Sequence, residues 1–188
     1  DEADDIVRSL GGKRAVCSDP RLCYVFSANA GRDPIFSAIC CASRLNAQMA
    51  QLEEKLEAQY GWANEICLNM GIAHDADIRC EADAPRASSV MIPGGVFDQA
   101  SLLSGIAGKG EIWITQTAAA RLPKNLADRV ELGVDHQGTF LRHIFKRLSD
   151  FPQISPLLRT DPDMADLSVA RINAVERYVP AQAVTNED

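Results

Sequence analysis

The side chains that most often carry protein chemistry are spread along this 188-residue chain and are not grouped in motifs. None of the six cysteines forms a C-x-x-C pair, and no cysteine and histidine stand at zinc-binding spacing. The histidines His74, His136 and His143 lie on different predicted elements, without a serine, cysteine or acid at catalytic spacing. The sequence therefore predicts reduced structural thiols, which behave as small buried hydrophobes, and no metal or nucleophile site at the histidines.

Two further short patterns have an ordinary structural explanation. Gly105, Gly108 and Gly110 suggest a phosphate-binding loop, but such a loop needs a preceding strand and a following Lys-Ser or Lys-Thr pair. These glycines indicate the end of a helix instead. Asp19 stands directly before Pro20, and both residue types favour a turn.

Composition excludes some classes of protein. The formal net charge of -7 argues against a nucleic-acid-binding surface, which is usually basic. No apolar run approaches the roughly 20 residues that cross a bilayer, and no signal peptide opens the sequence. We expect a cytoplasmic protein, or the cytoplasmic part of a larger membrane-anchored protein, with any membrane contact made through upstream sequence.

The predicted elements alternate between helices and short strands. Glycine pairs, turn residues and apolar periodicity mark each boundary. The sequence predicts a helix over 2–10, a hairpin of Lys13–Cys17 and Leu22–Phe26, a long helix Pro34–Tyr60, strands Glu65–Ala73, Ala76–Cys80 and Ser88–Ile92, a helix opening at Gly94, a strand Glu111–Thr115, a helix Gln116–Leu122, and closing strands Arg129–Gly133 and Leu141–Leu148. This order favours an α+β fold, with helices packed on a mostly antiparallel sheet.

The segment Gly94 to Gln116 is the centre of this pattern. A glycine pair opens a helix, glycines 108 and 110 end it, and a short apolar strand follows. We expect the Thr115 hydroxyl to cap the next helix. The four prolines and polar ending after Ser149 predict a C-terminal extension over 149–188 that holds at most one helix, Met164–Arg177.

Four pieces of the chain together resemble the class III nucleotidyl cyclase catalytic domain, the adenylate/guanylate cyclase family. Asp5-Ile-Val-Arg-Ser-Leu-Gly-Gly followed by Leu22-Cys-Tyr-Val-Phe resembles the family's helix, glycine pair and hairpin, and Leu68-Asn-Met-Gly-Ile-Ala-His-Asp resembles its "R-I-G-I-H-x-G" strand. Gly94 to Gln116 resembles its "G-x-x-V-N-x-A-x-R-L…G-E-I" segment, and Val130-Glu-Leu-Gly with 141–148 resembles its closing strand pair. The resemblance implies a ferredoxin-like, cyclase-type core within a cyclase-homology domain over 1–148.

The resemblance also implies where metal ligands would lie. Family members hold two Mg²⁺ or Mn²⁺ ions with two aspartates, because these cations prefer hard oxygen ligands. The family's first aspartate lies on a strand ahead of the matched region, and no matching segment is found here. The second lies in the hairpin turn, where a gapless alignment places Pro20. Asp19 is one residue away, either as a turn former or as a metal ligand in a shifted turn.

The remaining family positions have lost their functional groups. An asparagine for the ribose corresponds to Asp98, and an arginine for the transition-state phosphate corresponds to Leu102. Leucine cannot neutralise phosphate charge, and an aspartate would repel it. The purine-selecting lysine corresponds to Val16, and its acidic partner corresponds to Met91. Asp98 is instead expected to cap or solvate its helix.

These replacements predict a catalytically degenerate cyclase-homology domain that serves as a regulatory or dimerisation module in signalling. Because family members form dimers with shared sites, we expect a homodimer or a heterodimer with another cyclase-type domain, and nucleotide binding stays open. The alternative is an active adenylate or guanylate cyclase that uses Mg²⁺ or Mn²⁺, Asp19, and Lys109 or Arg86 in place of the arginine. An unrelated ferredoxin-like binding protein is a third class.

Overall fold

A computed structural model describes residues 2–15, 21–28, 31–61, 66–75, 94–151 and 164–176 of the chain. The predicted strands Ala76–Cys80 and Ser88–Ile92 lie outside these residues. The elements are α1 (Glu2–Ser9), β1 (Gly12–Ala15), β2 (Cys23–Phe26), α2 (Pro34–Tyr60), β3 (Met70–Ile72), α3 (Gly94–Ile106), β4 (Ile112–Thr115), α4 (Gln116–Ala119), α5 (Lys124–Ala127), β5 (Val130–His136), β6 (Thr139–Arg142), β7 (Lys146–Arg147), the 3₁₀ turn η1 (Leu148–Asp150) and β8 (Ser168–Val175).

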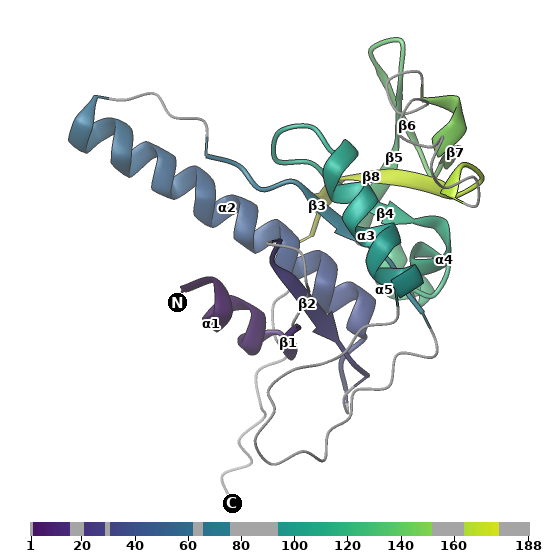
Figure 1. The fold of residues 1–188 in the computed structure, drawn as a ribbon, viewed down its shortest axis with the longest axis horizontal. Helices are drawn as coiled ribbons and strands as arrows, with labels where there is room; N and C mark the ends of the chain where they lie inside the picture. The colour runs from purple at the N-terminus through teal and green to yellow at the C-terminus, as the bar shows by residue number, and fades with distance from the viewer. Residues whose placement is uncertain are drawn as a thin grey trace, which may run out of the picture.

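The larger sheet has the strand order β3-β4-β8-β5-β6, with β7 also paired to β8. Only the β3–β4 pair is parallel among these ladders. The hairpin β1–β2 forms a separate antiparallel sheet. The predicted α+β class with a mostly antiparallel sheet is therefore confirmed (Figure 1).

The predicted helix Met164–Arg177 is wrong, because residues 168–175 of this segment form the strand β8. Val169 and Ala170 are fully buried, and β8 pairs with β4 on one side and β5 on the other. A short apolar run fits a helix or a buried strand equally well when only its periodicity is known, and the two neighbouring ladders select the strand. The sheet thus includes residues from both sides of the predicted boundary at 148.

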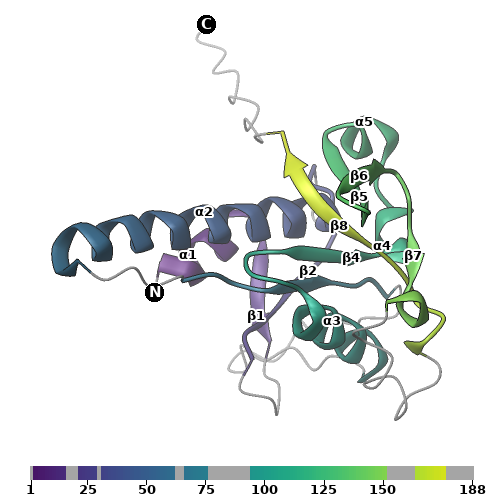
Figure 2. The same cartoon turned by 90° about the horizontal axis from the view of Figure 1, so that it is seen from above.

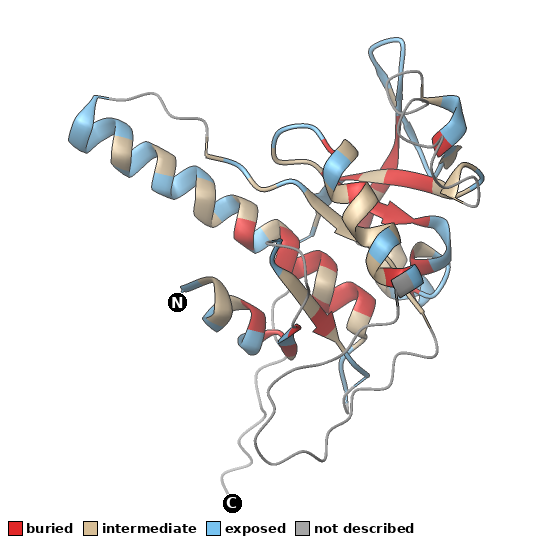
Figure 3. Cartoon of the chain, viewed as in Figure 1, coloured by how far each residue is buried: buried red, intermediate tan, exposed pale blue. Residues whose placement is uncertain are grey.

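The long helix α2 has the predicted bounds, because both of its ends are fixed by local chemistry. The Asp33 side chain accepts a hydrogen bond from the Phe36 N–H at 2.8 Å, Pro34 occupies the first turn, and Gly61 takes the left-handed conformation that ends the helix. Its buried residues extend only as far as Leu45. The C-terminal half of α2 extends beyond the sheet and is partly exposed (Figure 3).

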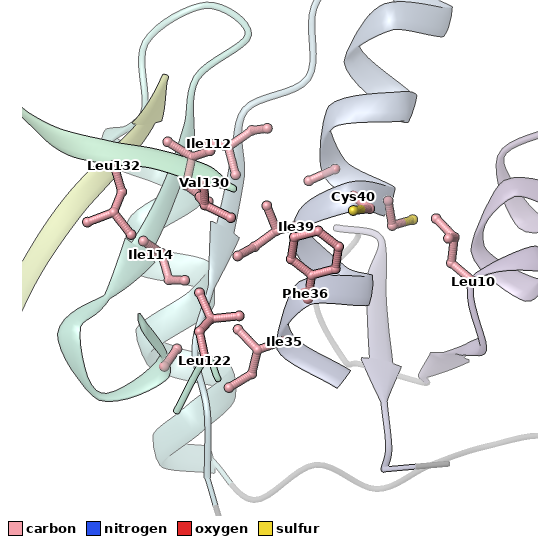
Figure 4. Close-up of a cluster of buried hydrophobic side chains, with 14 of the residues drawn as sticks. Leu10, Ile35, Phe36, Ile39, Cys40, Ile112, Ile114, Leu122, Val130 and Leu132 are labelled. Atoms are coloured by element: carbon pink, nitrogen blue, oxygen red, sulfur yellow. The ribbon is translucent and has the colours of Figure 1, made fainter. Parts of the chain in front are cut away.

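The helices form layers on both faces of the sheet. In Figure 2, α1 and α2 lie on one side of β4 and α3 lies on the other. Ile112 and Ile114 of β4 join the core cluster beneath α2 (Figure 4), whereas Trp113 between them joins the cluster beneath α3. This alternation follows from the two-residue period of a strand. It gives β4, whose four residues are all buried, side chains in both clusters.

Several smaller predictions differ from the structure in extent. The predicted strand Glu65–Ala73 is confirmed only over the three residues of β3. The helix after Thr115 has its predicted cap, since Ala118 N–H donates to the Thr115 hydroxyl at 3.2 Å, but it ends at Ala119 and a separate α5 follows Pro123. The closing strand pair is present as β5 and β6, with β7 separated from β6. In the described residues no helix is long and apolar enough to cross a membrane.

The four described cysteines divide by burial, and Cys23 is half-buried. Cys40 and Cys41 on α2 are buried, as predicted for structural thiols, whereas Cys67 is exposed and contradicts that prediction. Burial raises the pKa of the Cys40 thiol, and it raises the pKa of the Cys41 thiol from 9.0 to about 11. The Arg44 side chain opposes this shift at Cys41 without cancelling it.

Among the described cysteines, thiol labelling at pH 8 should therefore modify Cys67 before Cys40 and Cys41, and these two should stay unmodified until the protein unfolds. The reactive species is the thiolate, which burial disfavours at both helix positions. A time course with a maleimide, read by peptide mass spectrometry, measures the order. The Cys67→Ser variant is the matched control and should lose only the fast phase. Labelling of Cys41 at the rate of Cys67 in the folded protein would contradict the expectation.

Candidate functional site

The candidate site lies where the distal end of the β1–β2 hairpin meets α3. The Arg21 Nη1 atom donates to the Ser101 carbonyl oxygen at 2.9 Å and also bonds the Ser101 hydroxyl. The Ser104 hydroxyl donates to the same carbonyl at 2.9 Å. Contact between residues 80 positions apart joins the two elements that the sequence resemblance assigns to the metal and ribose-phosphate groups.

Two of the predicted site positions lie on α3, and they differ in environment. Asp98 is exposed to solvent. Leu102 is half-buried and packs against the cluster formed by Leu103, Trp113 and their neighbours. The Leu102 side chain therefore contributes to packing of α3 on the sheet, and neither position provides a cation for a phosphate group.

Of the other predicted positions, only Lys109 lies among the described residues. Val16, Asp19, Pro20, Arg86 and Met91 lie outside the described residues. Lys109 follows the C-terminal end of α3, whereas Asp98 lies in its second turn. The eight residue steps from Asp98 to Ile106 span about 12 Å along the helix axis, so Lys109 lies at the opposite end of α3 from Asp98.

A close contact with β3 fixes the position of α3. A Cβ atom added at Gly71 would lie 2.1 Å from the Ala100 carbonyl oxygen and 2.7 Å from the Leu103 Cβ. Only glycine permits this approach, because these neighbours belong to the helix backbone or to its first side-chain atom. The glycine of the predicted strand thus holds the face of α3 that carries Ala100 and Leu103 against β3.

The other end of α3 is held by a charged cluster centred on Glu111. Its Oε2 atom accepts from the Gly108 N–H at 2.8 Å and from Trp113 Nε1 at 2.9 Å, while Arg171 Nη1 lies 3.0 Å from Oε1. Arg171 Nη1 also lies 2.8 Å from Asp135 Oδ2. This cluster joins the turn after α3 to three strands of the sheet.

Burial by itself would raise the pKa of Glu111. The hydrogen bonds from Trp113 and Gly108 and the Arg171 guanidinium outweigh that effect and hold the pKa below its ordinary value of 4.5. Glu111 is therefore ionised at neutral pH, and its charge stabilises Arg171, whose Nε atom is buried without a hydrogen-bond partner. The cluster is structural, since its carboxylates are occupied by protein donors.

Sequence reasoning missed two of these residues. Arg21 stands outside every family motif, and its contact with Ser101 depends on the folded position of the hairpin. Arg171 falls in the segment predicted as a helix of the extension. Only Glu111 had a sequence signal, in the "G-E-I" part of the family pattern. Among the described residues no group of three or more His, Cys, Asp or Glu side chains is placed to hold a metal ion, and His136 and His143 are exposed.

Comparisons with known proteins identify the fold alone. The sequence matches no protein-family model and no curated protein. Among solved structures, the crystal structure of the adenylyl cyclase CyaB from P. aeruginosa aligns with a TM-score of 0.56 at 14% identity, covering 95% of this chain and 80% of that chain. The crystal structure of the guanylyl cyclase Cya2 aligns with a TM-score of 0.54 at 11% identity, covering 93% of this chain and 76% of that chain. The chain is similar in fold to adenylyl and guanylyl cyclase structures.

Proposed function

We propose that this chain, which has a cyclase-type fold, is a catalytically degenerate cyclase-homology domain that acts as a regulatory or dimerisation module in signalling. One observation carries the proposal. Leu102, at the position where the family resemblance expects the transition-state arginine, packs into the apolar cluster beneath α3. Its side chain has no charge, and it packs against the apolar cluster while half-buried.

The chemistry of phosphoryl transfer explains why this replacement is severe. Charge develops on the phosphate oxygens in the transition state, and preorganised cations provide most of the stabilisation. Asp98, one helical turn before Leu102, adds a negative charge that would repel a triphosphate. A domain with these two residues on α3 lacks the charge pattern that this reaction needs.

Dimer formation follows from the same proposal. The chain shares its fold with adenylyl and guanylyl cyclase structures, and the family resemblance implies dimers with shared sites. We propose a homodimer or a heterodimer with another cyclase-type domain, in which this chain is the regulatory member.

Arg21 supports the alternative of an active adenylate or guanylate cyclase. It brings a guanidinium group to α3, and Asp19 stands two positions earlier in the chain. In this alternative, Asp19 would hold Mg²⁺ or Mn²⁺, since a carboxylate oxygen suits either ion, and Arg21 would bind the triphosphate in place of the missing arginine.

A product assay separates the two functions. We expect no cyclic nucleotide above background when the purified protein is incubated with Mn²⁺ and ATP or GTP and analysed by mass spectrometry. Variants Asp19→Ala and Arg21→Ala are assayed beside Arg8→Ala, a control that removes an exposed arginine on α1. Turnover that both site variants abolish and that Arg8→Ala retains would overturn the proposal in favour of the active enzyme.

A further inference from the structure

A small pocket lies where the end of α1, the first two turns of α2 and the short helix α5 meet. The buried part of its lining is apolar and includes Leu10, Phe36 and Cys40. Its volume is about 80 Å³, whereas one water molecule needs roughly 10–15 Å³. The pocket therefore suits a ligand of about six non-hydrogen atoms and is too small for a nucleotide. Helices α1 and α2 lie across the sheet from α3, so the pocket is separate from the candidate site (Figure 2).

The lining also contains a polar side chain to which the protein gives no partner. Ser37, at the end of the first turn of α2, is only 8% exposed. Its backbone N–H bonds the Asp33 carbonyl oxygen at 3.0 Å, but its hydroxyl forms no hydrogen bond within the described part of the chain. A buried hydroxyl without a hydrogen bond is unfavourable, and a polar atom of a ligand would supply the missing partner.

The exposed rim of the pocket carries the guanidinium group of Arg32. Its Nη1 atom donates to the Ser9 carbonyl oxygen at 2.8 Å, which holds the side chain between the end of α1 and the start of α2. Arg32 has no ion pair with a described residue. The carboxylate of the adjacent Asp33 instead caps α2, where it accepts from the Phe36 N–H at 2.8 Å. Most of the five guanidinium donors of Arg32 therefore remain for a ligand, and their planar fork matches a carboxylate.

The charges next to the pocket favour an anion. Burial raises the pKa of the Cys40 thiol, and Arg129 and Arg44 oppose that rise through their positive charges. Both guanidinium groups therefore act on a residue that lines the pocket. Glu176 lies 3.8 Å from Arg129 and balances that cation. Arg44 forms no ion pair with the described residues, so Arg44 and Arg32 leave an excess of positive charge.

We propose that this pocket binds a short-chain aliphatic carboxylate, with the four-carbon anion butyrate as its representative. The carboxylate lies at the rim, where Arg32 and the Ser37 hydroxyl donate to its oxygens, and the alkyl chain packs against the apolar lining. A neutral molecule of the same shape loses the charged bonds to Arg32, and inorganic phosphate lacks the alkyl chain. The proposal goes beyond the regulatory function and holds whether or not the domain is catalytic, because no residue of the pocket belongs to the candidate site.

A titration of the whole ¹⁵N-labelled chain with butyrate, followed by NMR at constant ionic strength, tests the proposal. We expect saturable shifts of the amide signals of Leu10, Phe36, Ser37 and Cys40, and no shift at Ser101 on α3. The expected dissociation constant is about 1 mM, an affinity within reach of a ligand of this size.

Matched ligands and variants isolate the recognition of the carboxylate. Butyramide, the neutral counterpart of butyrate, should bind at least tenfold more weakly, and phosphate should not shift these signals. Arg32→Gln should weaken butyrate binding at least tenfold, and Ser37→Ala should weaken it several-fold. Arg8→Gln is the control, because Arg8 is an exposed arginine on α1 that lies outside the pocket and pairs with Asp5. It should bind butyrate as the wild type does.

The opposite results would overturn the proposal. Absence of saturable shifts at butyrate concentrations tenfold above the expected constant would exclude the ligand. Equal affinity for butyrate and butyramide, or equal affinity of the wild type and Arg32→Gln, would exclude recognition of a carboxylate by this guanidinium group. Shifts that phosphate reproduces would show that the alkyl chain is not recognised, and shifts confined to α3 would place binding at the candidate site.

Discussion

A chain that ends at Asp150 is expected not to fold cooperatively. It would lack β8, which pairs with β4, β5 and β7. Val169, Ala170 and Ile172 of β8 are buried, and burial of one Val or Ile side chain contributes about 1.5–3 kcal/mol. Loss of these side chains and of three ladders is comparable to the whole stability of about 5–15 kcal/mol that is typical of a domain.

Thermal unfolding followed by circular dichroism measures this effect. The control is a chain that ends at Glu176, which retains β8 and every other described element. We expect a sigmoidal transition for the control and for the whole chain, and a gradual, non-cooperative change for the chain that ends at Asp150. A cooperative transition in the shorter chain, within a few degrees of the control, would contradict the central position of β8.

The Glu111→Gln variant is expected to lower the free energy of unfolding by about 1–3 kcal/mol at pH 7, a range typical of breaking a partly buried charged hydrogen bond. The substitution keeps the shape of the side chain but removes the charge that faces Arg171. It also leaves fewer acceptors for the Gly108 N–H and for Trp113 Nε1. Because Asp135 still contacts Arg171, we expect destabilisation without complete unfolding.

This effect has a defined pH dependence. Glu111 has a lowered pKa in the folded protein, so its contribution to stability is fully present above the ordinary value of 4.5. The contribution is lost as the pH falls through the lower folded value. Urea unfolding at pH 7 and pH 3.5 should therefore show a difference between wild type and variant that shrinks at the lower pH.

A second substitution provides the control for Glu111→Gln. Asp150→Asn removes an exposed pair with Arg147 at 3.9 Å, which should change stability by less than about 0.5 kcal/mol. Equal effects of the two substitutions, or a Glu111→Gln difference that grows as the pH falls, would show that the cluster does not hold α3 to the sheet.

Elements whose ends depend on neighbouring residues were predictable from the sequence. The bounds of α2 follow from Asp33, Pro34 and Gly61, each of which acts within one helical turn. The hairpin, α3 with its terminating glycines, and the Thr115 cap were predicted for the same reason. The two α3 positions of the candidate site could also be assigned, because they lie within one continuous motif.

The rest of the site depends on contacts between distant parts of the chain. Arg21 and Ser101 are 80 positions apart, and Arg171 and Glu111 are 60 positions apart. No local pattern specifies which carboxylate an arginine will meet. The resemblance indicated Asp98 and Leu102, but the packing of the half-buried Leu102 side chain against the cluster beneath α3 is a property of the folded layers.

The sequence by itself determined α2, the β1–β2 hairpin and the glycine-bounded α3, because these depend on residue type and short-range spacing. The tertiary structure alone decided that 168–175 is a strand at the centre of the sheet, since an apolar run becomes a strand only when distant edges pair with it.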